Sequence, residues 1–232
     1  MPPDPVLLAF DTSAAHCAAA LLRGDKIIAS QCEEMVKGQA ERLFPMLDEI
    51  LTDAGSNWAD LTAIGVGIGP GNFTGIRIAV SAARGLAMSL DVPAVGVSSF
   101  ETCRGALAGD GLAEVVCLPA PRQQVYLQVF NGSEVSDPVL TEITEDALSG
   151  VDVPNGVAQI TGACAADVAQ CLATPYALDV ASVTLPVNPA QTIAHLAAQR
   201  LKTGQGGTKP APLYVHPPDA APASDPPPVI LS

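Results

Sequence analysis

The sequence predicts an α/β protein of two lobes. Apolar runs of strand length alternate with helical segments in the first half, and a second series of strands begins after a break near residue 105. Of the 232 residues 48% are hydrophobic and only 15% are charged, so the chain can bury a sizeable interior. We expect a first lobe over 1–105, a smaller second lobe over 106–209 and an extended, proline-punctuated tail over 210–232.

The first lobe is predicted to open with a buried strand and an antiparallel hairpin. The turn Arg23-Gly24-Asp25 lies between two apolar runs and is a hairpin signal. Apolar residues in 38–52 recur at helical spacing, and a glycine-rich break precedes a second helix. The expected strands are 6–10, 17–22, 26–30, 61–68 and 92–97, and the expected helices are 38–52 and 73–90.

The second lobe is predicted to be smaller and less regular. Strands are expected at 114–118 and 124–130, and a weaker one at 156–161. An alanine-rich helix over 188–202 ends before Gly204, which is a typical helix stop signal. We assign that helix to the second lobe because it follows the second series of strands.

Charge and cysteine usage exclude several function classes. The net charge of −13 would repel a polyanion, so a nucleic acid, if one is involved, is held by something else. The alternative is that the acidic residues merely keep the protein soluble. The six cysteines have no C-x-x-C pair and read as reduced core residues. No signal peptide and no run of about 18 apolar residues is evident. We therefore expect a cytoplasmic protein without a membrane span.

Two short motifs offer a possible anion or nucleotide site. Asp11, Thr12 and Ser13 follow the first strand, where an acidic residue can hold a metal or phosphate, but a strand-end Asp also caps turns. Gly69 and Gly71 belong to a glycine-rich turn that leads into a helix, whose N–H groups could hold an anion. That turn matches neither a P-loop nor a dinucleotide motif, and a tight turn explains its glycines equally well. The histidines lack metal-ligand spacing, so we expect no metal.

The helix over 73–90 has more apolar surface than one core requires. At 3.6 residues per turn its apolar or small residues cover roughly 220°, whereas a helix on one core needs a stripe of somewhat over about 100°. Its small residues would let another helix approach closely, either the helix over 38–52 or one from a partner. The partner-binding residues we expect are Leu43, Met46, Leu47, Ile50, Gly75, Ile78, Ala79, Ala82, Gly85 and Leu86.

Three stretches resemble the TsaB (YeaZ) family of tRNA threonylcarbamoyladenosine biosynthesis proteins, within the glycoprotease-like superfamily. They are LAFDTS at 8–13, QAERLFP at 39–45 and GPGNFTGIR at 69–77, the last being the longest and most specific. Residues 125–126 and 212–215 match as well. The resemblance covers nearly the whole chain, though weakly between residues 130 and 190.

The resemblance implies a two-lobed, actin-like and Hsp70-like ATPase fold, which is ribonuclease H-like, with a truncated second lobe. It implies a subunit without transferase activity that binds a TsaD-like transferase through the two first-lobe helices, together with a TsaE-like ATPase. TsaD modifies adenosine next to the anticodon in tRNAs reading codons that begin with A. We further expect no cofactor of its own, with ATP only within the partner complex, and the net charge makes contact with tRNA indirect. When the chain is alone we expect a homodimer through the same helices, because an uncovered apolar surface often binds its own copy.

The chain departs from the family pattern at three places. Gln39 stands where the family often has His, and Asn72 where it often has Ser. Pro119, Ala120 and Pro121 replace an Asp-Ala-Arg before the tyrosine-containing strand, which removes a carboxylate that could face nucleotide phosphates or a metal.

An alternative reading is an enzyme of the same fold. An ATPase or small-molecule kinase would use Asp11 and the 69–75 turn to hold phosphates, and it would need an acidic loop and an adenosine-binding glycine pair in the second lobe. Neither 119–121 nor 161–163 supplies these convincingly. A third reading, a metalloprotease, is disfavoured because the sequence has neither metal-ligand spacing nor a recognisable nucleophile.

Overall fold

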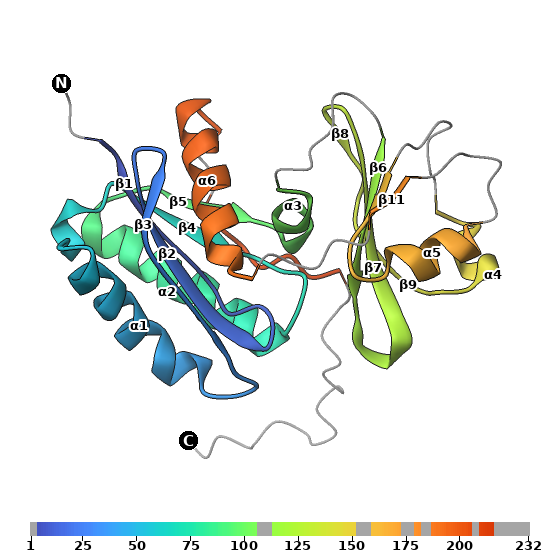
Figure 1. Ribbon diagram of the computed structural model, residues 1–232, viewed down its shortest axis with the longest axis horizontal. Helices are drawn as coiled ribbons and strands as arrows, with labels where there is room; N and C mark the ends of the chain where they lie inside the picture. The colour runs from blue at the N-terminus through green and yellow to red at the C-terminus, as the bar shows by residue number, and fades with distance from the viewer. Residues whose placement is uncertain are drawn as a thin grey trace, which may run out of the picture.

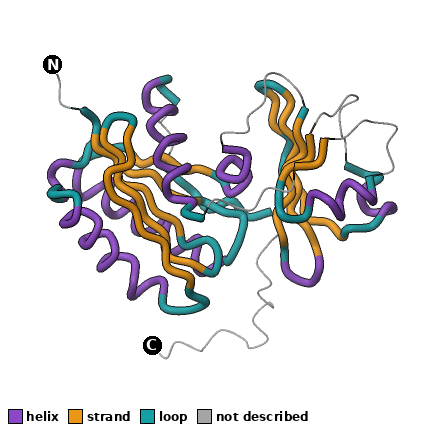
Figure 2. Tube along the Cα trace, in the orientation of Figure 1, coloured by secondary structure: helices purple, strands orange, loops and turns teal. Residues whose placement is uncertain are grey.

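The computed structural model describes residues 4–105, 113–151, 159–172, 179–181, 187–205 and 209–215. The chain forms two lobes, each built on one mixed β-sheet (Figure 1). Figure 2 shows the two sheets as separate stacks of strands with helices around them. The predicted α/β architecture of two lobes is confirmed.

The first sheet has the strand order β3-β2-β1-β4-β5. Its central strand β1 pairs antiparallel with β2 and parallel with β4, and β4 pairs parallel with β5. Every residue of β1 is buried, because helices cover both faces of the sheet. The strands are β1 (Val6–Asp11), β2 (His16–Arg23), β3 (Lys26–Glu34), β4 (Ala63–Gly67) and β5 (Ala94–Val97).

Two long helices lie on one face of this sheet and a third covers the other. The helices α1 (Gln39–Asp53) and α2 (Phe73–Leu90) pack with β1, β2 and β4 in the largest apolar cluster, and the short 3₁₀ helix η1 (Trp58–Asp60) follows α1. The helix α6 (Pro189–Lys202) packs against the opposite face.

The position of α6 corrects the predicted lobe boundary. We assigned residues 188–202 to the second lobe, but Ile193, Ala194 and Ala197 are buried against Leu7, Ala9 and their neighbours in the first sheet. Chain order misleads here, because a helix at the end of the sequence returns to the lobe at its beginning (Figure 1).

The second sheet repeats the strand pattern of the first. Its order is β11-β10-β6-β7-β8, with β9 also pairing with β7. The strand β6 is antiparallel to β7 and parallel to β10, as β1 is to β2 and β4. The helices described beside it, α4 (Glu145–Leu148) and α5 (Ala165–Cys171), are short. The strands are β6 (Glu114–Pro119), β7 (Gln124–Asn131), β8 (Glu134–Val135), β9 (Val139–Glu142), β10 (Gln159–Thr161) and β11 (Asp179–Ala181).

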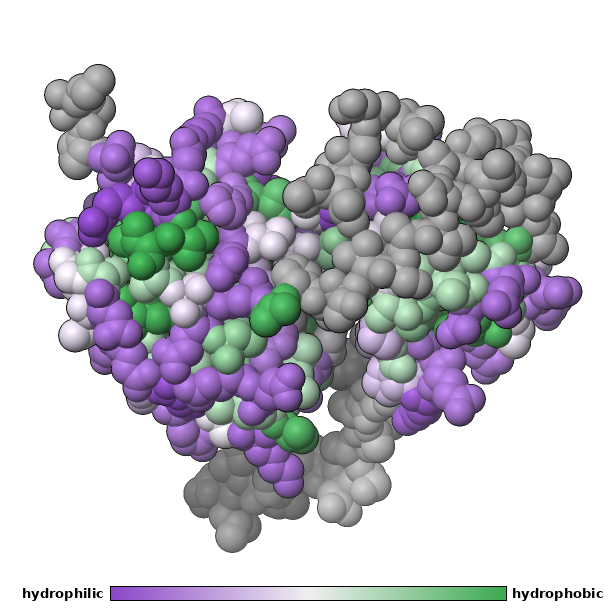
Figure 3. All heavy atoms as spheres, in the orientation of Figure 1, coloured by the Kyte–Doolittle hydropathy of each residue, from purple (hydrophilic) through white to green (hydrophobic). Residues whose placement is uncertain are grey.

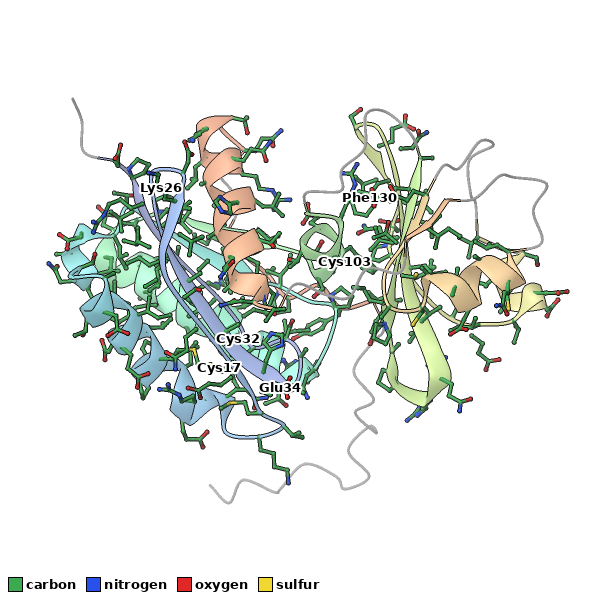
Figure 4. The ribbon with its side chains drawn as sticks, in the orientation of Figure 1. Cys17, Lys26, Cys32, Glu34, Cys103 and Phe130 are labelled. Carbon is green, nitrogen blue, oxygen red and sulfur yellow. The ribbon has the colours of Figure 1, made fainter. Side chains whose placement is uncertain are left out.

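A short helix joins the lobes. Phe100 and Cys103 of α3 (Ser99–Arg104) are buried together with Val116, Leu118 and Phe130 of the second sheet. Figure 4 shows Cys103 and Phe130 at the junction between α3 and that sheet. The two lobes therefore share an apolar cluster.

The start of the predicted tail belongs to the first lobe. Pro210 is buried, and the backbone N–H of Leu213 donates to the carbonyl of Ile68 at 2.8 Å. Residues 209–215 form no helix or strand, as predicted, but they are packed. The rest of the predicted tail, 216–232, lies outside the described residues, as does part of the predicted strand at 156–161. Among the described residues no helix is long and apolar enough to span a bilayer.

Candidate functional site

The apolar stripe of α1 faces its own sheet. Leu43, Met46 and Leu47 are fully buried and Ile50 is 2% exposed, all in the core cluster that includes β1. We expected these four residues to contact a partner, and the structure corrects that expectation. In the folded chain they hold α1 on the sheet and are not available to another protein.

The small residues of α2 have different surroundings. A Cβ on Gly75 would lie 1.9 Å from the carbonyl oxygen of Thr12, so this glycine permits a close approach within the chain, and Ala79 is fully buried. Ile78, Ala82 and Leu86 are half-buried, and Gly85 is exposed. A Cβ on Gly85 would have no atom within 4 Å.

Large apolar side chains extend from the outward side of both helices. Phe44 on α1 is 46% exposed and Met88 on α2 is 83% exposed. We define the docking face as Phe44, Ala82, Gly85, Leu86 and Met88. Phe44 was missed in the sequence analysis, although an aromatic residue on the polar side of an amphipathic pattern was the available signal.

Charges of opposite sign flank the docking face. The α1 side is acidic, and Arg42 there donates hydrogen bonds to both Glu33 and Glu49 at 2.6 to 2.8 Å. These hydrogen bonds hold the pKa values of the two carboxyl groups below their usual range. The α2 side carries Arg77 and Arg84, both exposed.

The glycine-rich turn before α2 packs closely against the backbone that follows β1 and does not form an open anion-binding loop. The side chain of Asn72 caps the helix by accepting from the Gly75 N–H at 2.9 Å, and the Asn72 N–H donates to the Ser13 carbonyl at 2.6 Å. A Cβ on Gly71 would lie 2.2 Å from the Ser13 carbonyl oxygen. Gly69 has a φ of 90°, where glycine is favoured. The chain's own groups occupy these N–H donors, which weakens the predicted anion site.

An aromatic contact fixes the returning segment 209–215 beside this turn. The guanidinium of Arg77 lies 3.7 Å from the centroid of the Phe73 ring, and its Nε donates to the Tyr214 hydroxyl at 2.7 Å. The Phe73 and Tyr214 rings are 5.0 Å apart. This contact joins the start of α2 to a residue 137 positions further along the chain.

Asp11 is buried at the end of β1, and both of its carboxylate oxygens have hydrogen-bond partners. Its carboxylate accepts from the N–H and the hydroxyl of Ser13, each at 3.0 Å, and His16 Nε2 lies 2.9 Å from Oδ2. Thr12 donates its hydroxyl to the Gly75 carbonyl at 2.7 Å. The predicted trio of Asp11, Thr12 and Ser13 thus matches the turn-capping alternative, in which local hydrogen bonds use the side chains.

A cleft of about 840 Å³ lies between the lobes and contains this cluster. Asp11, His16 and Glu34 line it from the first lobe, and Leu118 and Pro119 from the second. Figure 3 shows the molecule hollowed between its two lobes. The described lining residues include two carboxylates and neither lysine nor arginine, so a phosphate group would meet net repulsion from them.

Cys32 also lines the cleft, but it is a poor nucleophile. Burial, and then the negative charges of Asp11 and Glu34, raise the pKa of its thiol. Figure 4 shows Cys32 and Glu34 near the end of β3 on the side of the lobe toward the middle of the molecule.

The second-lobe loop that faces the cleft has an unusual backbone. The turn η3 (Pro121–Gln123) joins β6 to β7, and Arg122 and Gln123 both have φ near +60°. As the sequence indicated, 119–121 supplies no carboxylate. No group of three metal-ligating side chains occurs within the part of the chain that the structure describes.

A protein-family model matches residues 26–203 and carries the description "TsaD: tRNA N6-adenosine threonylcarbamoyltransferase". That match covers well over half of the chain, and it includes β3, both long helices of the first lobe and α6.

Two curated relatives carry the name tRNA threonylcarbamoyladenosine biosynthesis protein TsaB. The *Escherichia coli* protein is 34% identical over 55% of this chain and 56% of its own length. The *Bacillus subtilis* protein is 39% identical over 53% of this chain and 54% of its own length. The chain therefore spans about half the length of the curated relatives it matches.

A solved structure extends the similarity to both lobes. YeaZ from *Pseudomonas aeruginosa* matches with a TM-score of 0.71 and 28% identity, over 90% of this chain and 99% of that one. This agreement, with the repeated strand pattern, confirms the predicted two-lobed actin-like fold.

Proposed function

Because the chain belongs to the family of the tRNA N6-adenosine threonylcarbamoyltransferase TsaD, we propose that it is a non-catalytic subunit of the machinery that makes threonylcarbamoyladenosine in tRNA. In this proposal it binds a TsaD-like transferase through the docking face and supports that enzyme's active site. The transferase modifies the adenosine next to the anticodon in tRNAs that read codons beginning with A.

The observation that carries the proposal is the contrast between two glycines of α2. Gly75 is required by its own chain, because the Thr12 carbonyl leaves no room for a Cβ. Gly85 has no such neighbour, yet glycine within a helix destabilises it by roughly 0.5–1 kcal/mol relative to alanine. A bare position beside exposed Met88 allows a partner helix to approach near the short end of the usual range of about 8–10 Å.

The remaining parts of the proposal rest on the net charge of the chain and on the hydrogen bonds that Asp11 makes. With Asp11 engaged and no cation lining the cleft, the chain binds no cofactor of its own, and ATP binds only within a complex that includes a TsaE-like ATPase. Its net charge of −13 makes tRNA contact indirect. Without a partner, a second copy covers the docking face, and the protein acts in the cytoplasm with the tRNA.

The test is a substitution at Gly85 that changes the outside of the helix alone. We expect Gly85→Arg to remain folded, as judged by its circular dichroism melt, and to lose co-purification with a TsaD-like transferase, because the long charged side chain prevents close helix approach. Ala166→Arg on α5 is the matched control, since Ala166 is exposed in the second lobe, and it should bind normally. Normal binding by Gly85→Arg would refute docking through this face.

The enzyme alternative has one observation in its favour, which is the position of the cleft between two lobes beside Asp11. Calorimetric titration of the isolated protein with ATP and Mg²⁺ distinguishes the two proposals. Micromolar binding with turnover supports an ATPase or kinase, whereas the absence of both supports the subunit.

A further inference from the structure

The mouth of the interlobe cleft is the second apolar surface of the first lobe. Val36, in the loop between β3 and α1, is 79% exposed, and Val187, just before α6, is 95% exposed. Both line the cleft, together with Met35 and, from the other lobe, Pro119. Exposed apolar residues from three separate segments thus gather around one opening, where a single exposed valine would need no explanation.

This mouth is continuous with the start of a docking helix. Val36 lies two residues before Gly38, the N-cap of α1, so this loop of the cleft mouth leads directly into that helix. A partner bound to the docking face would therefore need to extend only past the start of α1 to contact the cleft mouth.

The charges in the cleft specify the kind of group that fits. Glu34 lines the mouth and is exposed, Asp11 is buried, and the described lining residues include no lysine or arginine. Lys37 follows Val36 in sequence but is outside the lining. A positively charged side chain would gain attraction from both carboxylates, and the volume of about 840 Å³ is more than one side chain fills.

We propose that the cleft mouth receives a segment of the partner transferase in which an apolar side chain lies next to a lysine or arginine. This inference rests on the proposed function and names a second contact for the same partner. The apolar side chain would cover Val36 and Val187, and the cation would pair with Glu34.

Other occupants fit the charges less well. The chain's own segment 216–232 contains Asp219 and Asp225 and neither lysine nor arginine. A second copy brings a net charge of −13 to an already acidic opening. A nucleotide would bring phosphates to two carboxylates. A cationic protein segment avoids all three kinds of repulsion.

The experiment measures the affinity of the full chain for a purified TsaD-like transferase by calorimetry. We expect Val36→Asn and Glu34→Lys each to weaken binding at least about tenfold, because the first replaces an apolar side chain by an uncharged polar one and the second reverses the attraction. Glu34→Gln should have a smaller effect. Val135→Asn is the control, since Val135 is 53% exposed on β8 of the second lobe, and it should change affinity less than about twofold.

A photo-crosslinking residue placed at position 36 identifies the occupant. Capture of a transferase peptide with an apolar residue beside lysine or arginine supports the proposal. Capture of a second copy, or of a transferase peptide without such a cation, overturns it. If Gly85→Arg abolishes binding while Val36→Asn and Glu34→Lys bind normally, this inference fails and the proposed function stands. If the wild-type chain does not bind the transferase at all, both fail.

Discussion

The two lobes share a strand pattern and differ in their helices. Both sheets have a central strand with an antiparallel neighbour on one side and parallel strands on the other. In the first lobe the sheet carries helices of 15, 18 and 14 residues, while in the second α4 and α5 have 4 and 7. At 1.5 Å per residue α2 extends about 27 Å and α5 only about 10 Å. The strand pattern is repeated, but among the described residues the long helices all pack on the first sheet.

Each lobe has a glycine in close contact with a backbone carbonyl. A Cβ on Gly75 in the first lobe, or on Gly162 in the second, would lie 1.9 Å from a backbone carbonyl oxygen, that of Thr12 or of Cys117 respectively. Each glycine brings the chain near a helix start into direct contact with the central strand or with the residue that follows it. Close packing at these two glycines therefore belongs to the fold, whereas Gly85 is exposed on the lobe for which we propose docking.

The largest expected effect tests how far the lobes depend on each other. Phe100 is fully buried in the cluster that α3 shares with the second sheet. We expect Phe100→Ala to lower the free energy of unfolding by about 3–5 kcal/mol and to split the calorimetric transition in two, with the second lobe unfolding first. Leu47→Ala, a truncation within the first-lobe core, should lower stability by about 2–5 kcal/mol without splitting it. A single transition for Phe100→Ala would mean that other contacts couple the lobes.

The next effect compares the two glycines of α2. Gly75→Ala should reduce the free energy of unfolding by about 3 kcal/mol, because the new Cβ would overlap the backbone carbonyl of Thr12, which a rotamer change cannot relieve. Gly85→Ala, in the same helix, should raise it by roughly 0.5–1 kcal/mol. Urea denaturation curves of both variants measure the difference. Equal and small effects would contradict the assignment of separate roles to these residues.

The smallest expected effect concerns buried thiols in the two lobes. Burial raises the pKa of Cys17 in the first lobe to about 11 and that of Cys117 in the second to about 12, from an ordinary value near 9. Because the folded pKa is raised, the stabilisation is complete below about pH 9 and is lost as pH rises toward the folded value. Between pH 8 and 11, the free energy of unfolding should therefore fall by about 2 kcal/mol more in the wild type than in Cys117→Ala.

The measurement for this thiol is the free energy of unfolding by urea at several pH values. Cys117→Val, which keeps more of the buried volume, should have the same shallower pH dependence even though its stability at pH 8 differs. A pH dependence identical to that of the wild type in both variants would show that Cys117 ionises in the folded protein.

Much of the fold could be read from local patterns. Helical spacing in 38–52 and the turn before residue 73 place α1 and α2 to within a residue, because the 3.6-residue period and the helix caps are properties of short segments. The assignment of α6 failed, because which sheet a helix covers depends on contacts between residues nearly 200 positions apart. For the proposed docking site, the apolar pattern selected on α1 a stripe that the core buries, whereas the exposed residues of the two helices could be identified only from the fold.

The sequence by itself determined the identity of the elements, the acidic character of the chain and the glycine-rich turn, because these depend on composition and on neighbours within a few residues. Only the tertiary structure decided that Gly75 serves its own chain while Gly85 is bare, that Asp11 is occupied by Ser13 and His16, and that a cleft opens beside Val36. The physical reason is that residues of equal size and polarity differ in role only through what covers them, and that is fixed by distant parts of the chain.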